Sequence, residues 1–170
     1  MGHSVRIFAG ASAALAPFRQ IDPAVLFYTL TPASDLAVLP FDDDLQDRLH
    51  ARFGTGDWPE NQSIRLSTTD QSFATDCSSA APLAYIETDY FGGEGTQSAM
   101  LWQASQVLIG PITLDNAQRA QRQPALWPIN VVLRTLGVRA RPPMDEFATF
   151  GLANFRSNDD VHARAWPLRT

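Results

Sequence analysis

The stretch Leu83-Ala-Tyr-Ile-Glu-Thr-Asp-Tyr-Phe91, followed by Gly92-Gly-Glu-Gly95, decides the fold that the sequence predicts. Aromatic and β-branched residues dominate it, and it is bounded by Pro82 and by a glycine-rich turn, a pattern typical of a strand that enters a tight hairpin. The next two expected strands are residues 96–103 and 106–112. We therefore expect residues 83–91 to lie inside an antiparallel sheet, paired with the strand after Gly95.

The rest of the chain mixes expected strands and helices. Three further strands are expected near the N-terminus, at residues 5–9, 24–30 and 36–41. Capping residues, apolar spacing and terminating glycines or prolines predict helices at residues 42–54, 67–79, 127–137 and 145–152. A loop is expected at 114–126 and a polar tail from 157. Because strands and helices do not alternate regularly, the pattern favours α+β: a central antiparallel sheet with helices packed against it, in a single domain spanning residues 1–170.

Composition and charge exclude several functional classes. The chain has 13 basic and 18 acidic residues, and its formal net charge of −5 argues against nucleic acid as a direct ligand. No apolar run approaches the roughly 20 residues of a membrane span, so we expect no membrane association. The apolar stretch near the N-terminus is too short for a secretory signal. With Cys77 as the only cysteine, an intrachain disulfide is impossible, and we expect a reducing, cytoplasmic location.

Two carboxylates in the deciding stretch form the strongest candidate site. In a strand, Tyr85, Glu87 and Asp89 share one face, while the residues between them share the other. Three interpretations stay open: ion pairs with local Arg side chains, contact with a protein partner, or a hard-cation or acid–base site. On the partner interpretation, the contact residues are expected to be Glu87, Asp89, Tyr90, Phe91, Glu94, Trp102, Asp159 and Asp160.

The residues needed for catalysis or transition-metal binding are sparse. His3, His50 and His162 are scattered, with His50 expected on a helix surface. Cys77 follows Asp76, whose charge raises rather than lowers a thiol pKa. One Cys and three distant His are too few for a zinc site, and no nucleophile elbow is present. We therefore assign no catalytic residue, no metal ligand and no cofactor, and an enzyme is the less favoured class.

A longer pattern carries a resemblance. Tyr85-x-Glu87-Thr-Asp89-Tyr-Phe-Gly-Gly-x-Gly-x-Gln97, continued by Ala99 and Trp102, resembles an uncharacterised family of small bacterial proteins. Segments 127–137 and 145–152 look similar too, so the likeness covers about the last half of the chain. It implies no particular activity. In size, acidity and lack of catalytic motifs, the chain is also similar in type to immunity proteins that neutralise interbacterial toxins.

These observations lead to one favoured function and two alternatives. We expect a cytoplasmic protein of the immunity class that binds a basic toxin domain and covers its active site. The first alternative is a small enzyme or hard-cation-binding protein that uses Glu87 and Asp89, with residues 158–160 as further ligands. The second is an adaptor domain.

Overall fold

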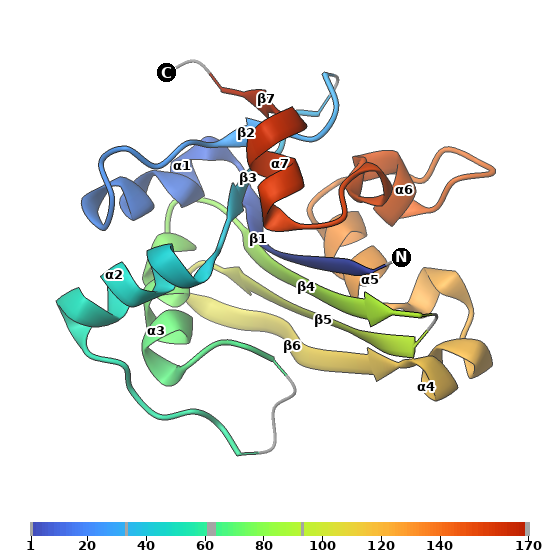
Figure 1. The fold of residues 1–170 in the computed structure, drawn as a ribbon, viewed down its shortest axis with the longest axis horizontal. Coiled ribbons are helices and arrows are strands. Elements are labelled where there is room, and N and C mark those ends of the chain that lie inside the picture. The colour runs from blue at the N-terminus through green and yellow to red at the C-terminus, as the bar shows by residue number, and fades with distance from the viewer. Residues whose placement is uncertain (1, 33, 61–63, 93, 169–170) are drawn as a thin grey trace.

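The computed structural model describes residues 2–32, 34–60, 64–92 and 94–168 (Figure 1). It confirms the α+β fold with a central antiparallel sheet. The sheet has the strand order β6-β5-β4-β1-β3-β2-β7, and all pairs of named strands are antiparallel. The strands are β1 (His3–Gly10), β2 (Tyr28–Thr29), β3 (Ala37–Pro40), β4 (Leu83–Phe91), β5 (Glu94–Gln103), β6 (Gln106–Asp115) and β7 (Trp166–Pro167).

Strand β4 lies inside the sheet, as predicted, between β1 and β5. The hairpin that joins β4 to β5 closes with Phe91 paired to Glu94. At Gly95 the backbone has φ +150°, and a Cβ atom there would lie 2.0 Å from the Asp89 carbonyl oxygen. Only glycine tolerates this approach, which explains the glycine on the returning side of the turn.

Capping side chains set the starts of several helices. The Asp42 carboxylate accepts a hydrogen bond from the backbone N–H of Leu45, and Ser67 and Asp70 form the predicted reciprocal capping box. The helices are α1 (Ser12–Leu15), α2 (Asp43–Phe53), α3 (Thr68–Cys77), α4 (Asn116–Gln121), α5 (Pro128–Thr135), α6 (Glu146–Phe150) and α7 (Asn158–Arg164). Short 3-10 turns follow α1, α4 and α6 at residues 16–20, 124–126 and 152–154.

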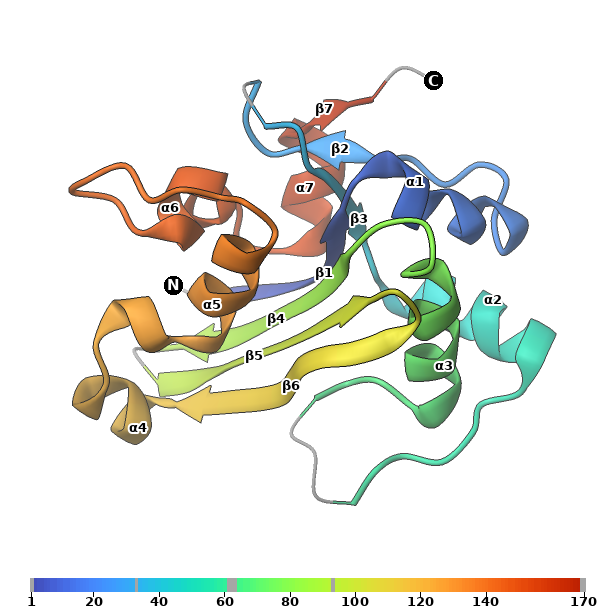
Figure 2. The ribbon, with the colours of Figure 1, turned by 180° about the vertical axis from the view of Figure 1, so that it is seen from behind.

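A hydrophobic core lies on each face of the sheet. The first core joins β1, β4 and β5 to α5, α6 and α7 through residues such as Ile7, Ile86, Leu101, Ile129, Phe150 and Val161. The second core joins the sheet to α1, α2 and α3 through residues such as Phe8, Leu15, Phe41, Leu49, Tyr85 and Trp102. Helices α2 and α3 stand at one end of the strands, and α4, α5 and α6 stand at the other (Figures 1 and 2).

Three expectations for the chain need correction. Of the expected strand 24–30, only Tyr28–Thr29 forms a strand. The backbone N–H groups of Ala24 and Val25 instead donate to the Asp22 side chain and carbonyl, in a turn. The expected loop 114–126 contains α4, which starts at a capping box formed by Asp115 and Gln118. The polar tail contains α7, capped by the Ser157 side chain. Short polar helices of this kind lack the apolar stripe by which sequence patterns reveal helices.

Within the described residues, no helix has the length and apolar character needed to cross a membrane.

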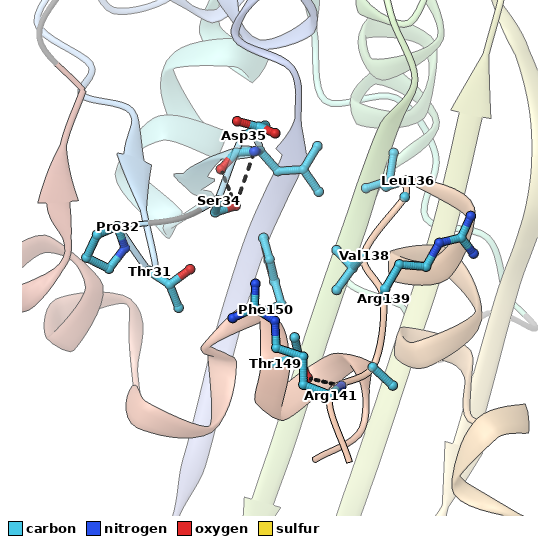
Figure 3. Close-up of a pocket in the computed structure, with 13 residues that line it drawn as sticks. Thr31, Pro32, Ser34, Asp35, Leu136, Val138, Arg139, Arg141, Thr149 and Phe150 are labelled. Atoms are coloured by element: carbon cyan, nitrogen blue, oxygen red, sulfur yellow. Dashed lines mark hydrogen bonds between the residues drawn. The ribbon is translucent and has the colours of Figure 1, made fainter. Parts of the chain in front are cut away.

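A pocket lies on the first-core side of the sheet (Figure 3). It has a volume of about 580 Å³, and its walls are residues 31–32 and 34–36, between β2 and β3, and residues 136–141 and 149–150, which follow α5 and end α6. Thr31, Leu36, Val138, Arg141 and Phe150 are among the residues that line it.

Candidate functional site

The face of the sheet that carries the second core is covered by helices at one end only. At that end Tyr85 is fully buried beneath α2 and α3. Toward the hairpin the same face of β4 opens, and the side chain of Asp89 is 54% exposed. Phe91, at the end of the strand, is 80% exposed. The same face of β4 is therefore buried at Tyr85 and open to solvent at Phe91.

Asp89, Phe91 and Glu94 together form the exposed end of this face, which we call the hairpin-tip patch. Phe91 pairs directly with Glu94, and directly paired residues of an antiparallel sheet point to the same side. Asp89 lies two residues before Phe91 and therefore shares that side. The patch combines two exposed carboxylates with an exposed aromatic ring, and all three residues belong to the set expected from the sequence on the partner interpretation.

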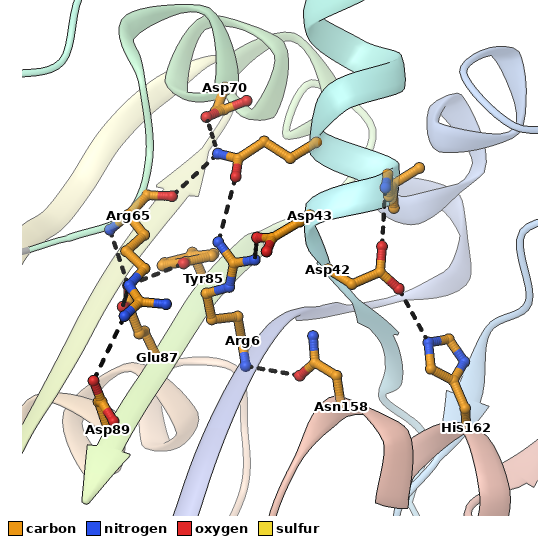
Figure 4. Close-up of polar contacts among 12 residues, drawn as sticks. Arg6, Asp42, Asp43, Arg65, Asp70, Tyr85, Glu87, Asp89, Asn158 and His162 are labelled. Carbon is orange, nitrogen blue, oxygen red and sulfur yellow. Dashed lines mark hydrogen bonds and ion pairs between the residues drawn. The ribbon is translucent and has the colours of Figure 1, made fainter.

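Glu87 differs from Asp89, because it is only 7% exposed. One of its carboxylate oxygens accepts hydrogen bonds from the Tyr85 hydroxyl and from the backbone N–H of Arg65, both at 3.0 Å (Figure 4). The Arg65 guanidinium lies 3.5 Å from the other oxygen. Glu87 therefore connects the segment before α3 to the sheet, and its carboxylate is not presented to a partner.

Arg65 also approaches Asp89, at 3.6 Å. One guanidinium thus lies within ion-pair distance of both carboxylates, which is the geometry of the local ion-pair interpretation, and the three groups together keep one net negative charge. Arg65 lies outside every pattern that marks a site in the sequence, since it stands alone between Ile64 and Leu66. Only the fold brings it to β4.

The geometry does not favour the hard-cation alternative. No group of three His, Cys, Asp or Glu side chains within the described residues is arranged to hold a metal ion. Asp160 accepts a hydrogen bond from the Arg156 N–H and pairs with Arg164. Asp159 is exposed at the start of α7.

The start of α7 nevertheless lies near the hairpin-tip patch. The N–H of Ser4 donates to the Arg156 carbonyl at 2.7 Å, and Ser4 pairs with Asp89 across β1 and β4. Two strand spacings, about 10 Å, therefore separate the segment before α7 from β4 at this level. Asp159 adds an exposed negative charge to this side of the molecule.

Two expected partner contacts lie elsewhere. Tyr90 points to the opposite face, where Arg119 stacks 4.8 Å from its ring centre and Gln97 donates to its hydroxyl. Trp102 has 0% exposure and packs in the second core near Phe8. The expectation that Trp102 supplies an apolar anchor to a partner is therefore wrong, because its end of the face is the end that α2 and α3 cover.

His50 is also placed differently from its expected surface position. Its side chain is 11% exposed, and Nε2 lies 3.1 Å from Ser67 Oγ and 2.9 Å from Asp70 Oδ1. Ser, His and Asp are the residue types of a hydrolase triad, but in a triad the hydroxyl and the carboxylate contact different ring nitrogens. Here one nitrogen serves both and Ser67 is fully buried, so the three residues hold α2 against α3.

A second histidine bridges three elements. His162 of α7 lies 3.1 Å from the Tyr28 hydroxyl through Nδ1. Its Nε2 lies 3.3 Å from Asp42 Oδ2 (Figure 4). Tyr28 is buried, and burial raises the pKa of its hydroxyl. These contacts attach α7 to the edge of the sheet.

We expect Cys77 to react slowly with thiol reagents. It is buried, and burial, followed by the charge of Asp76, raises the pKa of its thiol to about 12. At pH 8 the native protein should react with an aromatic disulfide reagent more than about 100-fold more slowly than the chain in concentrated urea, where the thiol has an ordinary pKa. Raising the pH to 9 should speed the unfolded reaction and leave the native one slow. Equal rates in both states would contradict the buried placement.

Comparisons with protein-family models, with curated proteins and with solved structures gave no match to the chain.

Proposed function

We propose that this protein acts by stoichiometric binding to another protein, a toxin domain with a basic active-site cleft that it covers. The observation that carries the proposal is Phe91, an aromatic side chain 80% exposed and flanked on its own face by the carboxylates of Asp89 and Glu94. Exposed aromatic rings are costly to leave in water and are enriched among the residues that dominate binding energy.

Charge supports the same proposal. The chain carries a net charge of −5, and Asp43 and Asp159 add exposed carboxylates on elements beside β1. Such a surface accelerates association with a cationic cleft through long-range attraction. Its carboxylates are suited to pair with Arg or Lys side chains that normally hold a phosphate-bearing substrate.

On this proposal the protein works in the cytoplasm of a bacterium and belongs to the immunity class. The sequence pattern that resembles a family of small bacterial proteins includes Asp89 and Phe91 but leaves position 94 open, so that family would share only these two residues of the hairpin-tip patch. The role needs no cofactor, and the protein would act without catalytic turnover of its own.

The proposal predicts that the hairpin-tip patch controls affinity. Phe91→Ala should weaken binding of the partner by about 30-fold or more, the usual effect of removing a central aromatic anchor. The double reversal Asp89→Lys with Glu94→Lys should mainly slow association, and the loss should shrink as salt is added. Affinity and rates are measured by surface plasmon resonance with the protein that co-purifies from the native operon.

A matched control variant changes the net charge by the same amount at a site outside the hairpin-tip patch. Asp44 and Asp47 are exposed on α2, and reversing both to Lys should leave most of the affinity intact. Titration of the partner's activity should end at a fixed stoichiometric ratio. Unchanged affinity in the Phe91 variant, or turnover of a small substrate by the isolated protein, would reject the proposal.

A further inference from the structure

The pocket on the first-core side of the sheet is independent of the hairpin-tip patch, since the two lie on opposite faces. Its volume of about 580 Å³ falls within the range of small-molecule sites, roughly 300–1,000 Å³. Its base is apolar: Phe150 belongs to the first core, and Leu36, Leu136 and Val138 pack against that core. An occupant therefore needs an apolar body.

The polar groups of the pocket are biased toward positive charge. Arg139 and Arg141 line it, with Asp35 as the one acidic residue. Figure 3 shows the Arg141 guanidinium directed toward Thr31 and Ser34, across the pocket. The pocket thus has more basic than acidic side chains, whereas the whole chain has more acidic than basic ones and carries a net charge of −5.

These two guanidinium groups have no partner in the described part of the chain. Other arginines, such as Arg6, Arg65 and Arg134, form ion pairs with carboxylates. For Arg139 and Arg141, the structure contains neither an ion pair, nor a side-chain hydrogen bond, nor an aromatic contact with a described residue. A planar guanidinium aimed into a pocket is suited to hold a carboxylate through two parallel hydrogen bonds.

The backbone around Arg141 is held in place. Its N–H donates to Thr149 Oγ1 at 3.0 Å. On the facing wall, the Ser34 hydroxyl accepts from the Leu36 N–H and donates to the Leu36 carbonyl, both at 3.1 Å. Local hydrogen bonds thus order the backbone at Arg141 on one wall and at residues 34–36 on the other, while the Arg141 guanidinium is free to bind a ligand. Walls positioned in advance reduce the entropy lost on binding.

We propose that this pocket binds a small anionic amphiphile, a molecule with an apolar body and a carboxylate head. The apolar body would lie against Leu36, Val138 and Phe150, and the head would pair with Arg141. This site goes beyond the proposed protein binding and does not depend on it.

The test uses octanoate as the probe, with amide chemical shifts of the full chain followed by NMR. Saturable shifts are expected in residues 136–141 and 149–150. Octanol lacks the charge and inorganic phosphate lacks the apolar body, so both should bind at least about tenfold more weakly than octanoate. Equal binding of octanol or of phosphate, no saturable shifts, or shifts confined to the hairpin tip or β6 would overturn the proposal.

Variants identify the anion contact. Arg141→Ala should weaken octanoate binding by about tenfold or more, and Arg141→Lys should lose less affinity because the positive charge is kept. Arg122→Ala is the matched control: Arg122 is exposed and lies outside the pocket, so this variant should bind octanoate like the wild type. Equal losses in the Arg122 and Arg141 variants would show a general effect of charge and overturn the assignment.

Discussion

Trp102→Ala is expected to lower the free energy of unfolding by about 4 kcal/mol, since replacing a fully buried Trp removes its apolar contacts and leaves a large cavity. Trp102 has no exposed surface and packs beside Phe8 and Tyr85, between the sheet and the helices of the second core. A urea titration followed by far-UV circular dichroism measures the change.

Trp102→Phe is the informative companion variant. The indole Nε1 is buried without a hydrogen-bond partner in the described structure, and an unsatisfied buried donor costs about 1–3 kcal/mol. Phe removes that donor and still fills most of the volume, so the loss should be about 1 kcal/mol or less. A cost for the Phe variant as large as that for Ala would contradict this account and would indicate a partner for the indole N–H.

The same pair of variants separates core from interface. If Trp102 served a partner directly, the Phe variant would fold normally and still bind its partner more weakly. We expect its affinity to be unchanged, since no atom of Trp102 reaches the surface. This result would leave Phe91 as the aromatic anchor of the hairpin-tip patch.

The sequence predicts β4, α2 and α3 well because their signals are local. Aromatic and β-branched residues between Pro82 and Gly92 mark the strand, and Asp42 and Ser67 mark the helix starts through caps that act within three residues. The α4 helix is missed because Asp115 and Gln118 cap a segment without an apolar stripe. Such a helix is therefore found in the structure but not from the hydrophobic pattern of the sequence.

The candidate site was predictable in part, for a related reason. Alternation along β4 correctly places Glu87 and Asp89 on one face, because the direction of a side chain follows from backbone geometry. What covers that face comes from distant segments: Arg65 reaches Glu87 across 22 residues, and α2 and α3 bury Trp102. A period-two pattern contains no information about such long-range coverage.

Glu87 and Asp89 should therefore respond very differently to the same substitution. Glu87→Ala leaves the buried Tyr85 hydroxyl and the Arg65 N–H without their shared acceptor, so we expect a loss of about 3 kcal/mol. Asp89→Ala removes one solvent-screened contact with Arg65 and should change stability by no more than about 0.5 kcal/mol. Urea titrations of the two variants under identical conditions make the comparison.

Glu87→Gln distinguishes the hydrogen bonds from the charge. Its amide oxygen still accepts from the Tyr85 hydroxyl, so if hydrogen bonding dominates the loss should be about 1 kcal/mol. If the ion pair with Arg65 dominates, Gln should cost nearly as much as Ala. Because Arg65 is more than half exposed, water screens that pair, and we expect the smaller loss. Equal stability of the Glu87→Ala and Asp89→Ala variants would contradict the buried position of Glu87 and return it to the exposed surface that binds the partner.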